Sequence, residues 1–151
     1  MNILFIGQVI STQILKENFA ETGNLNDMAG NCFYNNMLDG FCKNNCYVET
    51  ISMVPKNIIK KYGKKFCEST ITYHLKVFYS FSPLRYLAMF FRAFLFTFGW
   101  CRKNPFSDSI IITNCLRVTQ CAGAMLACKI LKRKMITVVT LSLIHISSGS
   151  L

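Results

Sequence analysis

The feature that most constrains the fold is a strand–helix–strand pattern at residues 107–140. A β-branched run at 110–113 (IIIT) stops at Asn114-Cys115, a helical stretch follows, and a second β-rich run covers 135–140 (MITVVT). Both runs are apolar with little alternation, as expected for strands that are covered on both faces. Two such strands joined by a helix are typical of a βαβ unit in a parallel sheet. The pattern therefore predicts an α/β domain.

Earlier segments extend this pattern. Strands are predicted at 2–7 (with Val9 and Ile10 as an extension), 47–54 and 71–79, and helices at about 29–43, from 82 to about 100, and at 118–132. Asn31 is the expected N-cap of the first helix, and residues 11–28 and 56–65 are expected to be loops. This order predicts a doubly wound, mainly parallel, Rossmann-like sheet over residues 1–140.

Two helices differ in the surface that they are expected to bury. Residues 84–100 (LRYLAMFFRAFLFTFGW) are about one turn short of a bilayer crossing and include Arg85 and Arg92, so they predict a buried or interfacial helix rather than a membrane span. A helix that is apolar all round is usually buried. In the 118–132 helix, one broad apolar face is predicted, and small residues would allow close approach to a sheet. The residues of that face are Val118, Cys121, Ala122, Met125 and Leu126.

The chain is basic, with 17 Lys and Arg against 7 Asp and Glu and a net charge of +10. Such a surface is either simply solvated or attracts anions such as nucleotide phosphates, anionic lipid or acidic polysaccharide. No recognition helix, zinc finger or RNA platform accompanies the charge, so nucleic acid is not an expected partner. The lysines concentrate in two groups, at 56, 60, 61, 64 and 65 and at 129–134, where Arg133 joins them.

The eight cysteines do not form a metal-binding pattern. No CxxC pair occurs, and Cys42 and Cys46 have no second pair to complete a zinc site. The chain opens on a strand-like segment, without the basic and apolar regions of a signal peptide. These observations predict reduced thiols in a cytoplasmic protein, with no metal.

Candidate binding residues follow the predicted strands. In the loop after the first strand, Gly30 would let backbone approach a ligand, and the helix that follows would offer N–H groups to an anion. Asp27 could contact a sugar hydroxyl, Asn114 stands where parallel sheets place ligand contacts, and Arg117 could pair with a phosphate or an acidic sugar. A turn, a helix cap and a surface arginine are the simpler interpretations of these three. Neither GxGxxG nor a Walker loop is present.

No catalytic residue can be assigned. His74 lies in a strand-like run and His145 near the C-terminus, and neither has a motif partner. The carboxylates are few and form no convincing pair in the sequence.

Five segments together, NILFIG, MAGNCFYNNMLDGF, YVETISMVP, SIIITNCL and AGAMLACKILKRKMITVVT, resemble the N-terminal half of family 4 glycosyltransferases, which have the GT-B fold. The resemblance covers residues 3–140. It implies the acceptor-binding half of a retaining hexosyltransferase that moves a sugar from a nucleotide diphosphate sugar to a polysaccharide or lipid-linked acceptor. It implies that Gly30 and Asn31 belong to a loop facing the donor diphosphate, and that residues 114–117 lie at the cleft mouth.

The resemblance also implies limits. No cofactor beyond the donor substrate is expected, and the setting would be polysaccharide biosynthesis in the cytoplasm or at the inner face of the plasma membrane. The family's second, donor-binding half is absent from this chain, so no turnover is expected. Relatives carry an acidic residue after the VVT strand, where this chain has Leu141. The tail at 141–151 (LSLIHISSGSL) is therefore expected to be non-native or disordered.

Two other classes remain open at the level of sequence. One is a non-catalytic α/β binding module, although a receiver-like domain would need clustered acids at strand ends. The other is a membrane protein anchored by residues 84–100. Carbonate extraction of membranes separates the anchored from the peripheral case.

Overall fold

A computed structural model describes residues 1–7, 9–22, 28–54, 56–77, 84–114 and 118–139, with no description of the side chains at 18–29. The strands are β1 (Asn2–Ile6), β2 (Tyr47–Val54), β3 (Lys65–Glu68), β4 (Ile71–Val77), β5 (Ser109–Asn114) and β6 (Met135–Val138). The helices are α1 (Thr12–Thr22), α2 (Met28–Lys43), α3 (Lys56–Tyr62), α4 (Leu84–Lys103) and α5 (Val118–Ile130), with a short 3-10 helix at Phe106–Asp108.

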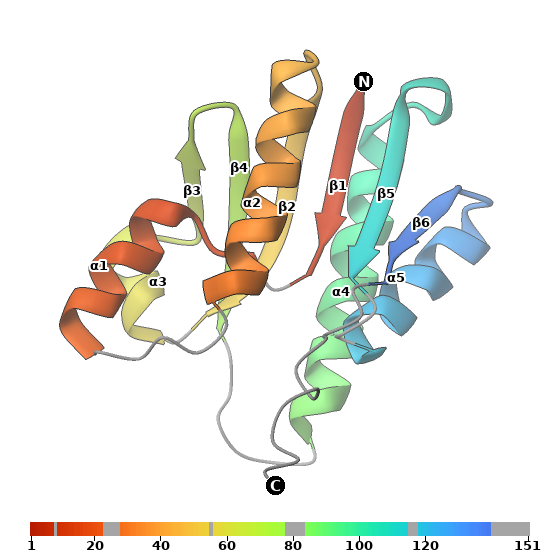
Figure 1. The fold of residues 1–151 in the computed structure, drawn as a ribbon. Coiled ribbons are helices and arrows are strands. Elements are labelled where there is room, and N and C mark those ends of the chain that lie inside the picture. The colour runs from red at the N-terminus through yellow and green to blue at the C-terminus, as the bar shows by residue number, and fades with distance from the viewer. Residues whose placement is uncertain (8, 23–27, 55, 78–83, 115–117, 140–151) are drawn as a thin grey trace, which may run out of the picture.

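The strands form one sheet in the order β3-β4-β2-β1-β5-β6 (Figure 1). All neighbouring pairs are parallel except β3–β4, which is an antiparallel hairpin. The chain builds the sheet outward from β1 in one direction through β4, and then returns to place β5 on the other side of β1. This is the doubly wound α/β arrangement that the sequence predicts.

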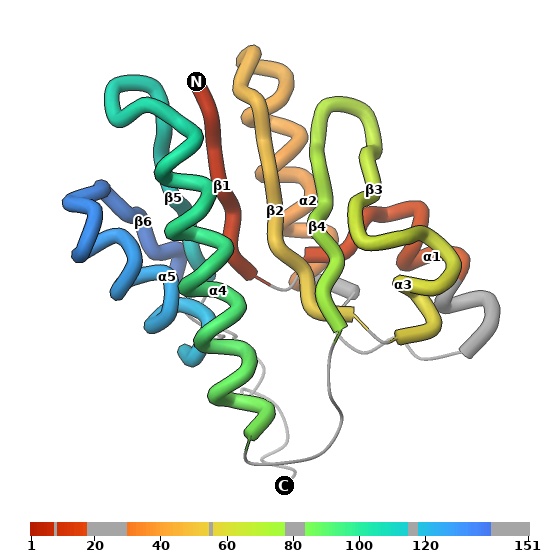
Figure 2. Tube along the Cα trace, turned by 180° about the vertical axis from the view of Figure 1, so that it is seen from behind, coloured from red at the N-terminus to blue at the C-terminus, as the bar shows by residue number. Residues whose placement is uncertain are grey.

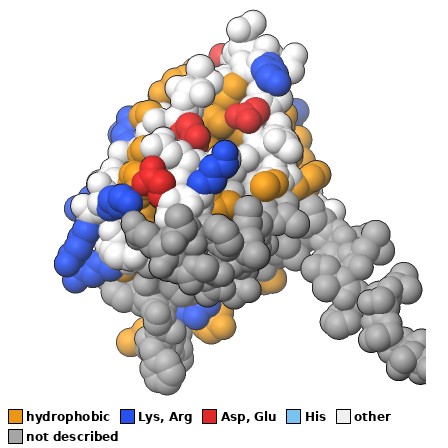
Figure 3. All heavy atoms as spheres, turned by 60° about the vertical axis from the view of Figure 1, so that its left-hand side comes forward, with side chains coloured by type: hydrophobic (Ala, Val, Ile, Leu, Met, Phe, Trp, Pro, Cys, Tyr) orange, Lys and Arg blue, Asp and Glu red, His pale blue; other side chains and the backbone are white. Residues whose placement is uncertain are grey.

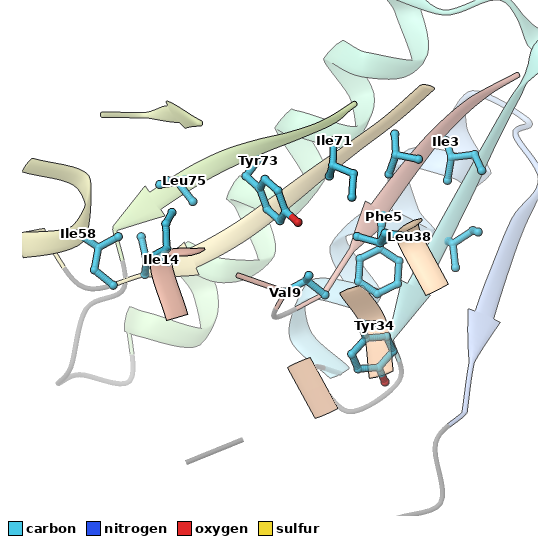
Figure 4. Packing of buried hydrophobic residues seen from close by; sticks show 13 residues of the cluster. Ile3, Phe5, Val9, Ile14, Tyr34, Leu38, Ile58, Ile71, Tyr73 and Leu75 are labelled. Carbon is cyan, nitrogen blue, oxygen red and sulfur yellow. The ribbon is translucent and has the colours of Figure 1, made fainter. Parts of the chain in front are cut away.

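Helices cover both faces of the sheet. Alternate residues of β1 point to opposite faces, because successive side chains of a strand do so. Ile3 and Phe5 join a core under α1, α2 and α3, with Tyr34, Leu38 and Tyr73 among its members (Figure 4). Leu4 and Ile6 join a second core under α4 and α5. Figure 2 shows the α4–α5 layer in front of the sheet. The central strands are therefore buried on both sides, which explains their continuous apolar sequence.

Two segments expected to be loops are helices. Residues 12–22 form α1, where the hydroxyl of Ser11 accepts a hydrogen bond from the amide of Ile14 at 3.1 Å, as an N-cap does. Residues 56–62 form α3. Both are so polar that their amphipathic pattern is weak. They are joined by polar contacts, since Glu17 accepts a hydrogen bond from the Tyr62 hydroxyl and lies 3.2 Å from the Lys61 ammonium.

Several predicted boundaries shift. The β1 strand ends at Ile6, so Val9 and Ile10 do not extend it. Helix α2 begins at Met28, which places Asn31 inside the helix, and the N-cap prediction for Asn31 is wrong. The predicted end of this helix at about residue 43 is confirmed, because α2 ends at Lys43 and Asn45 has a left-handed φ of 58°.

The predicted face of α5 is wrong. Val118, Met125 and Leu126 are exposed, and the buried side is made of small and polar residues: Gln120, Gly123, Ala124, Ala127 and Cys128. The reason is that α5 packs closely along α4. A Cβ on Gly123 would lie 2.4 Å from the carbonyl oxygen of Phe90 in α4, so only glycine fits there. The small residues serve contact between the two helices.

The outer elements are also less buried than expected. Strand β6 is an edge strand with Ile136 49% exposed, so it is not covered on both faces. Helix α4 buries Met89, Ala93 and Trp100 but leaves other apolar side chains in solvent, so it is not buried all round. The tail at 141–151, with His145, lies outside the described residues.

Candidate functional site at the carboxyl edge of the sheet

The sheet has a topological switch point between β1 and β5. These strands are parallel neighbours, but the chain leaves β1 toward the α1–α2 face and leaves β5 toward the α4–α5 face. In such sheets the two departing connections open a crevice beyond the strand carboxyl ends, and ligands bind there. Figure 1 shows β1 and β5 ending side by side at this edge.

Gly7 and Asn114 meet at the switch point. Gly7 directly follows β1 and is buried, and Asn114 is the last residue of β5 and is 4% exposed. A Cβ on Gly7 would lie 2.7 Å from the ring of Phe5 and 3.2 Å from the Cβ of Asn114. Gly7 therefore allows the chain to turn away from β1 while β5 stays close. The sequence pattern predicted a ligand contact at Asn114, whereas Gly7 was predicted only to end the first strand.

Asn31 and Asn35 fasten the segment after β1 to α2. The side chain of Asn31 accepts a hydrogen bond from the amide of Ile10 at 2.7 Å and donates one to the carbonyl oxygen of Ile10 at 2.9 Å. Asn35 donates to the same carbonyl at 2.9 Å and accepts a bond from the hydroxyl of Tyr73 at 3.0 Å. Asn31 is thus a positioning residue, because both ends of its amide are used within the protein.

The other sequence candidates divide into two groups. Gly30 lies in the first turn of α2, next to Asn31, so that turn stands beside the segment leaving β1. Asp27 and Arg117 lie outside the described residues. The elements that border the switch point therefore carry four residues: Gly7, Gly30, Asn31 and Asn114.

A second polar cluster lies between α4 and the sheet, and sequence reasoning missed it. The Nε2 atom of His74 in β4 lies 2.7 Å from Oε2 of Glu49 in β2, and the indole N–H of Trp100 in α4 donates to Oε1 of Glu49 at 2.9 Å. The His74 ring also packs against Phe96, with ring centroids 4.7 Å apart. All three partners border a pocket of about 380 Å³ whose outer wall includes Lys103.

The hydrogen bond from His74 holds the pKa of Glu49 below its ordinary value, against the opposing effect of burial, and the Trp100 indole adds to the lowering. A carboxylate that fixes one nitrogen of an imidazole is an arrangement that general bases use. The two residues are 25 positions apart on adjacent strands, so no local spacing could pair them. The available signal was the presence of an ionisable side chain, Glu49 or His74, inside each of two predicted strands.

The cysteines of the described residues are free thiols, and Cys101 and Cys128 are buried where α4 meets α5. A hydrogen bond with Cys128 lowers the pKa of the Cys101 thiol, and the same bond raises the pKa of Cys128. Over the described residues, no group of three His, Cys, Asp or Glu side chains could hold a metal ion.

Within the described part of the chain, the helices are too short or too polar for a bilayer crossing, α4 included. Comparison with models of protein families, with curated proteins and with solved structures gives no match.

Proposed function

We propose that the chain is the acceptor-side half of a retaining glycosyltransferase that uses a nucleotide diphosphate sugar, with a polysaccharide or lipid-linked acceptor. The observation that carries the proposal is the switch point, where Gly7 and Asn114 meet and where Asn31 in the first turn of α2 binds the segment that leaves β1. A sheet of this topology offers a crevice for a phosphorylated ligand at that edge. The segments that resemble family 4 glycosyltransferases include the residues that border this crevice.

The described residues would act on the donor by positioning and electrostatics. The first-turn amides of α2 have no partners within the helix, and such groups stabilise a nearby diphosphate. Departure of a nucleoside diphosphate leaves negative charge on its oxygens, and fixed N–H donors favour that step. Asn31 would serve indirectly, by holding Ile10 and so the loop against α2.

The first test is the coding sequence downstream of Thr140. A second α/β half carrying paired glutamates would support the proposal. A genomic reading frame that encodes residues 141–151 and then stops would contradict the view that a donor-binding half is missing.

The second test is a nuclear magnetic resonance titration of the 151-residue chain with uridine diphosphate. Binding weaker than about 1 mM is expected, because the proposal assigns most of the nucleotide contacts to a donor-binding half outside these 151 residues. The shifted amides should be those of Gly7, Gly30 and Asn114, and uridine without phosphates should shift none of them. Micromolar binding would contradict the proposal, because it would mean that this half itself holds the donor site. Shifts confined to the β2–β4 region would contradict the assignment of the site to the switch point.

A further inference from the structure

The C-terminal half of α4 leaves an open space in the pocket that it forms with the sheet. Leu95, Gly99 and Lys103 recur at every fourth residue, so they lie in one row along the helix, and all three border the pocket of about 380 Å³. Successive members of the row are about 6 Å apart along the helix axis. A Cβ on Gly99 would meet nothing within 4 Å. The row therefore consists of an apolar side chain, an empty space and an ammonium group, in that order.

The sheet side of the pocket presents a ring nitrogen whose position is fixed. His74 in β4 borders the pocket, and its Nε2 atom lies 2.7 Å from the carboxylate of Glu49. Because the pKa of Glu49 is lowered, its carboxylate is ionised and can only accept, so Nε2 carries the proton. In the neutral ring the other nitrogen, Nδ1, is then an acceptor, and it forms no hydrogen bond within the described part of the chain. The ring contact with Phe96 restricts the imidazole further.

The ammonium group of Lys103 is available to a ligand. Lys103 is exposed and forms no ion pair among the residues that the structure describes. In the last turn of α4, the carbonyl oxygens of Trp100 and Cys101 accept hydrogen bonds from Asn104 and Arg133. The helix therefore does not depend on Lys103 to bind its terminal carbonyl groups.

The charges around the pocket favour an anion. Of the described residues that border the pocket, only Glu49 is acidic, and its two oxygens are engaged by His74 and Trp100. Lys65 pairs with His74 across β3 and β4, and its charge adds to the lowering of the Glu49 pKa. Figure 3 shows Lys and Arg side chains gathered at the left border of the molecule, viewed from the side of α1 and α3.

We propose that this pocket binds a small organic anion in which an apolar ring carries a carboxylate and a hydroxyl group, as in a hydroxyaryl carboxylate. The carboxylate would pair with Lys103, and the hydroxyl would donate to Nδ1 of His74. The ring would fill the space at Gly99, in contact with Leu95 and Phe96. Apolar pockets with a few fixed polar groups are typical of small-molecule sites. An acidic sugar would instead place hydroxyl groups against Leu95 and Phe96, which cannot bind them.

This site is separate from the crevice at the switch point. The pocket lies on the α4 face of the sheet, over β2 and β4, whereas the crevice lies beyond the carboxyl ends of β1 and β5. Neither Gly7 nor Asn114 borders the pocket. The inference therefore does not rest on the glycosyltransferase proposal.

Tryptophan fluorescence of the whole chain tests the proposal, since Trp100 borders the pocket and is the only tryptophan of the sequence. Para-hydroxybenzoate should change the emission in a saturable way, with a Kd below about 1 mM. Benzoate lacks the hydroxyl and should bind roughly fivefold more weakly. Para-hydroxybenzyl alcohol lacks the charge and should also bind roughly fivefold more weakly. Glucuronate, an acidic sugar, should give no saturable change.

Filling the space at Gly99 should block the site. Gly99→Leu should weaken the binding of para-hydroxybenzoate by at least about tenfold, because the new side chain occupies the place of the ring. Gly40→Leu is the matched control, since an added Cβ at Gly40 in α2 also meets nothing within 4 Å. The control should bind like the unaltered chain.

Two further variants test the polar contacts. Lys103→Gln should weaken binding roughly fivefold. Lys43→Gln removes a charge from the last residue of α2, as Lys103→Gln does from the last residue of α4, and should have little effect. In His74→Gln the amide nitrogen can still donate to Glu49, but no acceptor takes the place of Nδ1. The preference for para-hydroxybenzoate over benzoate should therefore disappear.

Four results would overturn the proposal. They are the lack of a saturable change up to about 10 mM para-hydroxybenzoate, unchanged binding by Gly99→Leu, equal losses in Gly99→Leu and Gly40→Leu, and tighter binding of glucuronate than of para-hydroxybenzoate. Circular dichroism checks the folding of each variant. If Gly99→Leu does not fold, the exposed Lys103→Gln and its control decide the question, and equal binding by these two variants counts against the site.

Discussion

Buried polar side chains of the domain form hydrogen bonds with backbone groups that have no partner within a strand or helix. Ile10 lies between β1 and α1, where its amide and carbonyl lack secondary-structure partners. Asn31 and Asn35 supply those partners from α2. A buried backbone group without a hydrogen bond lowers the stability of the folded state. A side-chain amide therefore stabilises this segment as pairing with another strand would.

Replacing Asn31 with alanine should lower the free energy of unfolding by about 1–3 kcal/mol. The amide of Ile10 loses its partner, whereas its carbonyl keeps the bond from Asn35. Urea denaturation measures the effect. Asn36→Ala, at an exposed position of the same helix, is the control and should change the stability little. Equal effects of the two variants would mean that helix propensity, and not the bonds to Ile10, determines the result.

The Glu49–His74 pair should make stability depend on pH. Because the folded-state pKa of Glu49 is lowered from its ordinary 4.5, its contribution is present above that pH and is lost as the pH falls through the lowered pKa. Glu49→Gln should remove this part of the acid dependence. Urea midpoints measured between about pH 6 and pH 3 test the prediction, with Asp39→Asn on α2 as the control. An unchanged acid profile in Glu49→Gln would show that the pair contributes nothing.

At the scale of elements, contact between α4 and α5 is set by a single small residue. Gly123 brings the two helix backbones close at Phe90, and Ala124 and Ala127 continue the buried side of α5. Close approach buries the backbone of both helices and moves the larger side chains, Met125 and Leu126, to the outside.

Two glycine-to-alanine changes should have opposite signs. At Gly123 a methyl group would lie 2.4 Å from the carbonyl oxygen of Phe90, so α5 must move and stability should fall by about 1–3 kcal/mol. At Gly40 in α2 nothing lies within 4 Å of the added carbon, and alanine should stabilise the helix by about 0.5–1 kcal/mol. Thermal unfolding followed by circular dichroism compares them. A stabilised Gly123→Ala would mean that the helices are not in close contact.

At the scale of the whole molecule, protection from solvent decreases from the centre of the sheet to its edges. Strand β1 is paired on both sides and has helices on both faces, whereas β3 and β6 are edge strands with half their residues exposed. Local opening needs less free energy where fewer buried contacts are lost.

Amide hydrogen exchange should follow this order. The amides of β1 and of the buried part of β5 should exchange last, and those of β3 and β6 first. Mass spectrometry after exchange in deuterated buffer resolves these segments. Strand β2, which is also central, is an internal check and should behave like β1. Early exchange in β1 would contradict the strand order.

Much of the architecture could be predicted from sequence, because its signals are local. The runs at 2–6, 47–54, 71–77 and 109–114 are apolar enough to identify central strands without knowing their partners. Helices α1 and α3 escaped prediction because, among their described side chains, only Ile14 and Ile58 are buried, which leaves little apolar periodicity to detect. The second candidate site escaped for a different reason, since Glu49 and His74 become neighbours only when β2 and β4 pair.

The sequence by itself determined that this chain builds a doubly wound sheet, because burial of a strand on both faces requires an apolar composition that is visible in each strand separately. Only the tertiary structure decided which side chains meet. Gly7 lies against Asn114, Asn31 forms hydrogen bonds with Ile10, and His74 forms one with Glu49. The apolar side chains of Leu84, Leu87, Phe91 and Leu95 are exposed to solvent. Those contacts depend on strand order, register and the distance between packed helices, which arise from the whole chain and not from any local segment.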